Sequence, residues 1–193
     1  MRKLVVAEFV SLDGVIQAPG GADEDTEGGF EHGGWTWPFW HDDIGNHFFE
    51  AMSRADALLL GRKTWEIHGG AFEKMEGDPF ADALNNIRKY VVSATMESPS
   101  LWRNSTLIRD NVVETIRALK QEEGKSILLD GSSVLAHTLI ENDLVDEFVL
   151  HVYPIMLGSG KRLYPAGKRL DLKLVESSPL PTGVVFARYR RKE

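Results

Sequence analysis

The sequence predicts a three-layer α/β fold, in which helices cover both faces of a mainly parallel sheet. Short apolar segments, typical of strands buried on both faces, alternate along the chain with segments of helical periodicity. The last two strand-like segments follow each other across a turn rich in proline and glycine, 179–183, which predicts an antiparallel hairpin at one edge of the sheet. Because the chain has 193 residues without an internal repeat or a convincing linker, we expect one domain over 1–193.

The individual elements follow from the same patterns, taken in chain order. Apolar or alternating runs predict strands at 3–10, 55–61, 90–92, 106–108, 126–129, 145–153, 170–177 and 183–190. Helical spacing predicts helices at 43–54 and 111–122, and a further helix that starts within 130–133. We expect the first helix to turn Ile44, Phe48, Phe49 and Met52 to the core, and the last to turn Val134, Leu135, Leu139 and Ile140 inward.

A long polar insertion, at about 17–41, separates the first strand from the first helix. It contains Gly-Gly pairs, an acidic run at 23–27 and tryptophans at positions 35, 37 and 40. Connections of this length are usually functional or mobile. Trp37 and Trp40 are therefore candidates for an aromatic lid over a planar heterocycle, and the alternative is that the tryptophans anchor the insertion to the core.

Composition excludes several classes of function. The net charge of −7 opposes general nucleic-acid binding, although a few local cations suffice for a phosphorylated small molecule. The absence of cysteine excludes disulfides, thiolate metal sites and a cysteine nucleophile. His32, His41 and His47 match no recognised metal spacing, so no metal is expected. The start of the chain is too short and too charged for a signal peptide, and no segment approaches a membrane span, so we expect a cytoplasmic protein.

Two strand ends carry residues suited to phosphate. At the first, the second predicted strand ends in Gly61, followed at once by Arg62, Lys63 and Thr64. Arginine grips phosphate bidentately, lysine adds a point charge, and threonine can bond a phosphate oxygen. The alternative is a surface turn whose cations are solvated.

The second strand end is Asp130-Gly131-Ser132-Ser133. Glycine allows a ligand to approach the backbone, while serine hydroxyls and free helix N–H groups can cradle a pyrophosphate. The alternative is that Ser132 or Ser133 is an ordinary helix N-cap. One strand end could hold a monophosphate and the other a pyrophosphate, which is the charge layout of NADPH.

Three motifs resemble known sequences and keep their order over almost the whole chain. Residues 61–65 resemble the signature after the second strand of dihydrofolate reductase. Residues 11–16 resemble the first-strand motif of the reductase domain of bacterial riboflavin biosynthesis, and 146–148 with 154–164 are similar to the late strand-and-loop motif of that group. The chain is identified as a stand-alone member of the dihydrofolate reductase-like superfamily, of the riboflavin-reductase type.

This resemblance implies a reductase that uses NADPH, and relatives that often form homodimers. The region of the 2′-phosphate would be held by Arg62, Lys63 and Thr64. The adenosine ribose would be flanked by Ser93, Ala94 and Thr95. The pyrophosphate would be bound by Gly131, Ser132 and Ser133. Residues from Ser11 to Ile16 would edge the nicotinamide and substrate site. This chain departs from its relatives in one respect, because they commonly have Gly-Gly where it has Gly131-Ser132.

The catalytic residues are less well defined by the sequence. Asp13 is a candidate to orient the carboxamide or relay a proton, although a turn aspartate is equally natural there. Asp42 is a candidate substrate ligand at the start of the first helix, or else an acid that favours the helix dipole. His68 and His137 show no partner in the sequence and are interpreted as structural or solvated.

The function expected is therefore NADPH-dependent hydride transfer to a small, pterin- or pyrimidine-like heterocycle. The alternative is a protein that binds NADP(H) or a nucleotide without turnover, such as a sensor or a resistance-type binder. No nucleic-acid or membrane partner is expected.

Overall fold

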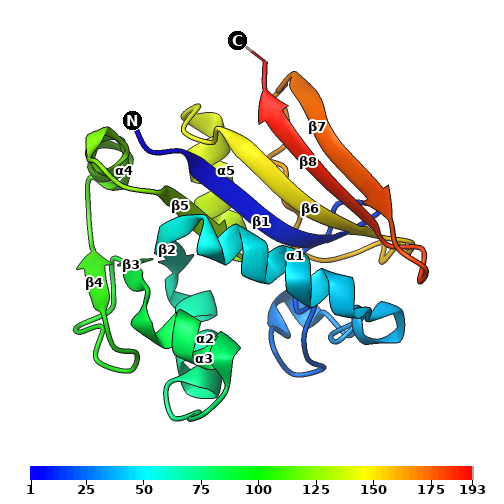
Figure 1. Ribbon diagram of the computed structural model, residues 1–193, viewed down its shortest axis with the longest axis horizontal. Helices are drawn as coiled ribbons and strands as arrows, with labels where there is room; N and C mark the ends of the chain where they lie inside the picture. Colours follow the sequence, from blue (N-terminus) through cyan, green and yellow to red (C-terminus); the bar gives the residue numbers. More distant parts are fainter. Residues whose placement is uncertain (193) are drawn as a thin grey trace.

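The computed structural model describes residues 1–192 and is built on an eight-stranded sheet (Figure 1). The strands are β1 (Leu4–Ser11), β2 (Ala55–Gly61), β3 (Arg88–Val92), β4 (Ser105–Ile108), β5 (Ser126–Asp130), β6 (Glu147–Tyr153), β7 (Leu172–Pro179) and β8 (Val185–Arg191). The helices are α1 (Asp42–Ser53), α2 (Arg62–Phe72), α3 (Pro79–Asn86), α4 (Val112–Gln121) and α5 (Ser133–Glu141), with short 3₁₀ turns at Glu27–Gly29 and Trp37–Phe39. No helix among these residues is long and apolar enough to cross a membrane.

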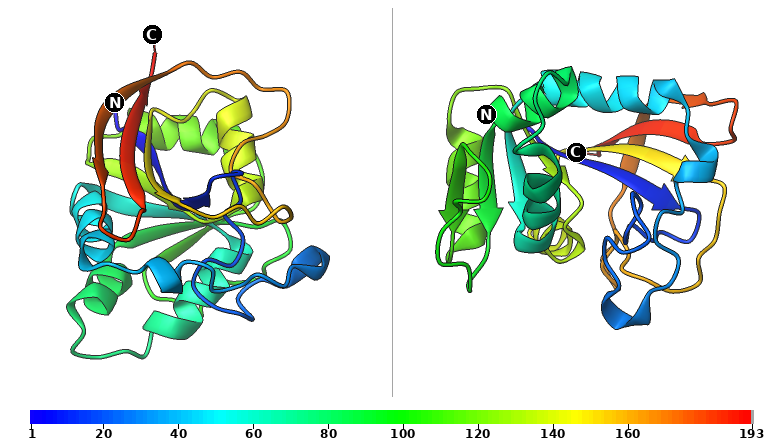
Figure 2. Two further views of the ribbon diagram at one scale, coloured as in Figure 1. Left: turned by 90° about the vertical axis from the view of Figure 1, so that its right-hand side faces the viewer. Right: turned by 90° about the horizontal axis from the view of Figure 1, so that it is seen from below.

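The strand order is β4-β3-β2-β5-β1-β6-β8-β7, and the six strands from β4 to β6 are parallel. Strand β8 pairs antiparallel with both β6 and β7, so the predicted hairpin closes one edge. Helices lie on both faces of the sheet (Figure 2). The three-layer α/β fold with its terminal hairpin is therefore confirmed.

Successive strand residues point alternately into two separate cores, which is why the central strands are almost uniformly apolar. On one face, Val5 and Leu58 pack with the buried side chains of α1, α2 and α3. On the other face, Val6 and Leu59 pack with those of α4 and α5. This two-sided burial fixes the register and leaves the carboxyl ends of β1, β2 and β5 at one edge.

Two helices were not assigned from the sequence, and two side chains were placed wrongly. Helix α2 begins directly after β2 and contains Gly69-Gly70, which lowers its helical propensity. Glycine is favoured at position 69 because the helix packs closely on Trp102, and a Cβ at Gly69 would lie 3.1 Å from Trp102 Cβ. Phe49 and Val134 do not enter the core, since they are 48% and 77% exposed. Both side chains line the cavity described below, which explains why these exposed positions are apolar.

The insertion lies over the carboxyl ends of the strands, beside the loop between β6 and β7 (Figure 2). Trp35 is buried, and its indole N–H donates to Gln17 O at 2.8 Å. Gln17 in turn accepts a bond from Lys161 N at 2.9 Å through Oε1. These contacts show how the first tryptophan anchors the insertion to the core.

Candidate functional site

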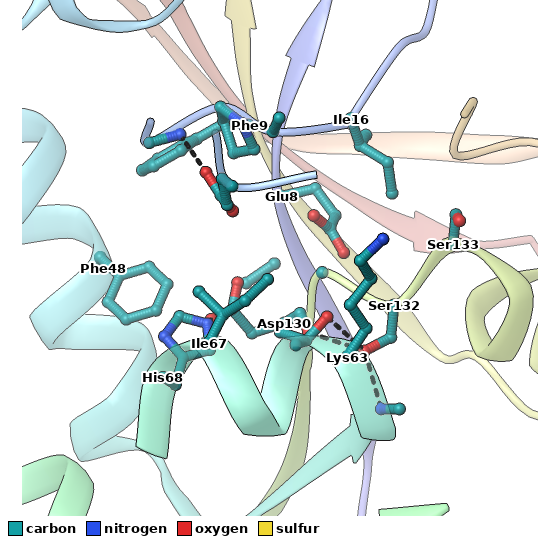
Figure 3. A pocket seen from close by; sticks show the side chains of 18 of the residues that line it. Glu8, Phe9, Ile16, Phe48, Lys63, Ile67, His68, Asp130, Ser132 and Ser133 are labelled. Carbon is teal, nitrogen blue, oxygen red and sulfur yellow. Dashed lines mark hydrogen bonds and ion pairs between the residues drawn. The ribbon is translucent and has the colours of Figure 1, made fainter. Parts of the chain in front are cut away.

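A cavity of about 970 Å³ opens at the carboxyl ends of β1 and β5, between α1, α2, the start of α5 and the insertion (Figure 3). Ligands of open α/β sheets bind at this edge of the sheet, next to helix N-termini. The volume lies at the upper end of the range of about 300–1,000 Å³ that is usual for small-molecule sites. Both strand ends singled out in the sequence line this cavity.

The two phosphate-type turns are in direct contact with each other. Gly61 N donates to Ser132 Oγ at 2.8 Å, and Ser132 Oγ donates to Thr64 Oγ1 at 3.0 Å. Gly131 has φ +60°, and a Cβ there would lie 2.9 Å from both Thr64 Cγ2 and Oγ1. Glycine is therefore required at position 131 by backbone conformation and by space.

Ser132 occupies the N-cap position of α5 without capping it through its side chain. Its backbone is left-handed, with φ 63° and ψ 55°, and its hydroxyl makes no cap hydrogen bond. The interpretation of Ser132 as an ordinary N-cap is therefore wrong, because the hydroxyl is directed to Gly61 and Thr64. A non-glycine residue in this conformation is uncommon, and such strain is often found at functional sites.

Arg62 joins the cavity to the third group of predicted cofactor residues. Its guanidinium donates to Glu66 Oε1 at 2.7 Å and to Thr95 Oγ1 at 3.1 Å. Ser93 Oγ accepts from Thr95 N and Met96 N, so it holds the turn that follows β3. Ser93, Ala94 and Thr95 lie outside the cavity lining, and Arg62 is their connection to it.

The cations at one end of the cavity are paired with acids of the insertion. Lys63 Nζ lies 2.6 Å from Asp25 Oδ1, and Lys161 Nζ lies 2.7 Å from Asp25 Oδ2. Glu27 Oε2 is 2.5 Å from Lys161 Nζ and 3.5 Å from Lys63 Nζ. Burial opposes ionisation of Asp25, but the two lysines outweigh it and lower the pKa of its carboxyl to about 2. Four charges thus fasten the insertion to α2 and to the loop after β6.

A second polar group stands deeper in the cavity, where Glu8, Asp130 and His68 come from β1, β5 and α2 (Figure 3). His68 Nε2 lies 3.1 Å from Asp130 Oδ2. Glu8 is 6% exposed, and its Oε1 has no hydrogen-bond partner among the described residues. Burial and the nearby Asp130 raise the pKa of Glu8 well above its ordinary value.

Sequence reasoning did not single out Glu8, interpreted His68 as structural or solvated, and named Asp130 only as part of the strand end 130–133. A glutamate inside an apolar strand, Val5-Val6-Ala7-Glu8-Phe9, is a local conflict that marks a special site and could have identified Glu8. The pairing of His68 with Asp130 joins positions 62 residues apart, and no local signal carries it.

Asp13 and Ser11 lie outside the cavity lining and fasten the neighbouring loop. Asp13 accepts bonds from Ser11 Oγ at 2.6 Å, Leu157 N at 3.1 Å and Gly158 N at 2.8 Å. Burial opposes ionisation, but these bonds outweigh it and lower the pKa of Asp13 to about 2. Its contacts are those of a turn aspartate that holds the loop after β6, and a proton role remains a prediction without structural support.

The predicted substrate residues divide into those that line the cavity and those that do not. Ile16 and Trp40 line it, whereas Trp37 and Asp42 do not. Trp37 is 62% exposed and donates from Nε1 to Gly20 O at 2.6 Å. Asp42 is in the first turn of α1, whose N-cap is His41, so its position favours the helix-dipole interpretation.

Aromatic and aliphatic side chains form the rest of the wall. Phe48 on α1 faces Ile67 on α2 across the cavity (Figure 3). Further rings come from Phe9, Phe72 and Phe80. His151 is 3% exposed, and burial together with His47 lowers its pKa to about 3, so it remains neutral. This compartment suits a flat, largely apolar ring.

Comparison with known proteins identifies the class. The model of the RibD C-terminal domain family matches residues 2–186, and the chain belongs to this family. It is 31% identical over 190 residues to the uncharacterized protein YyaP of Bacillus subtilis (strain 168), covering 95% of this chain and 92% of YyaP. The riboflavin-reductase resemblance seen in the sequence is thereby confirmed.

Solved structures show the same fold. A putative riboflavin biosynthesis protein from Shewanella sp. PV-4 superposes with a TM-score of 0.70 at 22% identity, over 99% of both chains. Dihydrofolate reductase from Enterococcus faecalis, solved in complex with NADP(H) and RAB-propyl, superposes with a TM-score of 0.64 at 16% identity, over 99% of this chain and 97% of the reductase. These likenesses show that the chain has the fold of a dihydrofolate reductase.

Proposed function

We propose that this chain is an NADPH-dependent reductase of a small pterin- or pyrimidine-like heterocycle. The observation that carries the proposal is the convergence of Gly61–Thr64 and Gly131–Ser133 on one cavity, whose remaining wall is aromatic and apolar. One part of this cavity presents cations and helix N-termini, and the other presents a ring-sized compartment. A dinucleotide beside a flat acceptor requires this combination.

The residues present fit the cofactor that the family implies. Gly131 lets the start of α5 lie against Thr64 and the other phosphate-type turn, because any Cβ there would meet Thr64. The unpartnered Glu8 Oε1 is a buried polar atom inside the cavity, and the nicotinamide carboxamide is a group that could satisfy it. Bound NADPH would supply the hydride.

The protein's own residues supply orientation and a dry site. Arg62, which bonds Thr95 in the turn after β3, would hold the 2′-phosphate that distinguishes NADPH from NADH. Phe48 and Ile67 would hold the acceptor ring between α1 and α2, and Trp40 would cover it from the insertion. Holding the reactants in this way lowers the barrier mainly through orientation and exclusion of water.

One set of contacts favours the alternative, a binder of NADP(H) without turnover. Lys63 and Lys161 are paired with Asp25 and Glu27, and the Ser132 hydroxyl is bonded to Gly61 N, so these anion-binding groups already have partners. A ligand phosphate therefore has to displace internal contacts at Lys63 and Gly61. This arrangement suits a protein that binds its ligand selectively and releases it readily.

Two measurements on the purified chain separate these functions. Calorimetric titration with NADPH and NADH is expected to show tighter binding of NADPH. The loss of absorbance at 340 nm is then followed with pterins, pyrimidines and quinones as acceptors, and the proposal expects oxidation of NADPH with at least one pterin or pyrimidine. Tight binding without oxidation of any acceptor would favour the binder, and no binding of either dinucleotide would contradict both functions. The proposal includes a cytoplasmic homodimer, for which sedimentation tests the oligomeric state.

A further inference from the structure

The His68–Asp130 pair is a titratable unit inside the cavity that the cofactor contacts leave unused. His68 lies one helical turn after Thr64 on α2, and Asp130 is the last residue of β5, directly before Gly131. Their side chains meet at 3.1 Å between Nε2 and Oδ2. The imidazole is thereby held beside both turns assigned to the cofactor, on the wall that faces Phe48 (Figure 3).

The orientation of the imidazole is fixed by two further contacts. The ring stacks on Phe72, with centroids 5.8 Å apart and planes at 18°, and on Trp102 at 6.1 Å and 27°. Because Asp130 occupies Nε2, the second ring nitrogen, Nδ1, is the one available to a ligand. A carboxylate that fixes the tautomer and plane of a histidine is a common arrangement for proton transfer.

The charges around His68 favour its protonated form. Asp130 from β5 and Glu24 from the insertion are the charged groups that face it. Burial opposes protonation, but the hydrogen bond and charge of Asp130, with the charge of Glu24, outweigh it and raise the pKa of His68 above 6.5. The two carboxylates beside His68 therefore favour the imidazolium form of its ring.

Resting on the reductase function proposed above, we propose that His68 is the proton donor of the reaction and that Asp130 is its positioning residue. Bound NADPH would supply a hydride, with its two electrons, from C4 of its dihydronicotinamide to the carbon of a C=N group in the acceptor ring. The π electrons of that group move to its nitrogen, which takes the proton from His68 Nδ1. The acceptor is reduced, the nicotinamide is oxidised, and His68 is left neutral until solvent reprotonates it.

The other titratable groups of this region are less suited to the task. The pKa of Glu8 is also raised, but at 6% exposure this residue has poor access to the solvent that must return its proton, whereas the His68 side chain is 26% exposed. His151 stays neutral with a pKa of about 3, and Asp13 stays ionised with a pKa of about 2 outside the cavity. Among these four groups, His68 alone combines a raised pKa with a side chain that water can reach.

The test compares His68→Gln and Asp130→Asn with His137→Gln as the matched control. His137 lies outside the cavity lining, and its Nε2 contacts Arg162 O at 2.8 Å. NADPH affinity is measured by fluorescence for every variant, and folding is checked by thermal unfolding. NADPH oxidation is measured from pH 5 to 9 with 7,8-dihydropterin and the other acceptors. The pKa of each histidine is measured by NMR titration.

The expected result is a wild-type rate that falls as pH rises through the pKa of His68. His68→Gln should lose about 10²–10⁴-fold in kcat and lose that limb of the profile, with NADPH affinity within twofold of wild type. Asp130→Asn should lower the pKa of His68 and move the limb to lower pH, and His137→Gln should match wild type. A rate and pH profile that survive in His68→Gln would overturn this inference alone. Failure of wild type to oxidise NADPH with any acceptor would overturn the proposed function, and the proton-donor role with it.

Discussion

Gly131 offers a quantitative test of the contact between the two turns. Substituting alanine places a Cβ on a backbone with φ +60°, which costs about 1–2 kcal/mol for a residue that has a Cβ. The same Cβ would lie 2.9 Å from Thr64 Cγ2 and Oγ1, and overpacking of this kind costs roughly 1–3 kcal/mol. We therefore expect Gly131→Ala to lower the free energy of unfolding by about 2–5 kcal/mol.

Urea unfolding measures this loss, and two further variants divide it into its parts. Gly167→Ala has a similar backbone, with φ +79°, but nothing lies within 4 Å of the new Cβ, so it should show only the backbone part. Thr64→Ala in the Gly131→Ala background removes both clashing atoms and should recover the steric part. If Gly131→Ala costs no more than Gly167→Ala, or if Thr64→Ala recovers nothing, the two turns do not pack as described.

Three other predictions concern the cofactor and the insertion. Arg62→Ala should weaken NADPH binding by about 1–3 kcal/mol and NADH binding much less, and calorimetry showing equal losses would refute the role of Arg62 at the 2′-phosphate. Asp25→Asn frees Lys63 and Lys161 of a counter-charge, so NADPH should bind more tightly at low salt, with a steeper salt dependence; weaker binding would mean that Asp25 positions the lysines. Because the pKa of Asp25 is lowered to about 2, its contribution to stability is present above the unfolded pKa of about 3.9 and is lost as pH falls toward 2. Acid unfolding of wild type should therefore be steeper than that of Asp25→Asn. Trp40→Ala should raise the KM of the acceptor while Trp37→Ala leaves it unchanged, since only Trp40 lines the cavity; equal effects would argue against a covering role.

The fold could be predicted from the sequence because its strongest signals are local. Buried strands such as β2 and β5 are short apolar runs, and the terminal hairpin is marked by its proline- and glycine-rich turn. Helix α2 was not assigned because its two glycines weaken the local pattern and its burial depends on Trp102, a residue distant in the sequence. Val134 and Phe49 were misplaced because periodicity does not distinguish a core from a cavity.

Site residues could be predicted from the sequence where they are contiguous at the end of one strand. Those that come from several separate elements could not. Gly61–Thr64 and Gly131–Ser133 are contiguous, and their meeting at one edge follows from the parallel sheet. The polar group of Glu8, His68 and Asp130 draws one side chain from each of three elements, so only tertiary structure brings it together. The pairing of Lys63 with Asp25 likewise depends on the path of the insertion, which has no periodicity to read.

The insertion is held through Asp25 and Glu27 to Lys63 and Lys161, and this contact has a consequence for engineering this protein. The same segment supplies Trp40 to the acceptor compartment and Asp25 to the cations at the cofactor end of the cavity. Specificity for the acceptor and specificity for the cofactor therefore depend on one and the same segment. Exchanging residues 17–41 between relatives, in order to broaden the range of acceptors, would also alter the electrostatic field at the dinucleotide end. Libraries that vary the tryptophans while keeping Asp25 and Glu27 would change one property at a time.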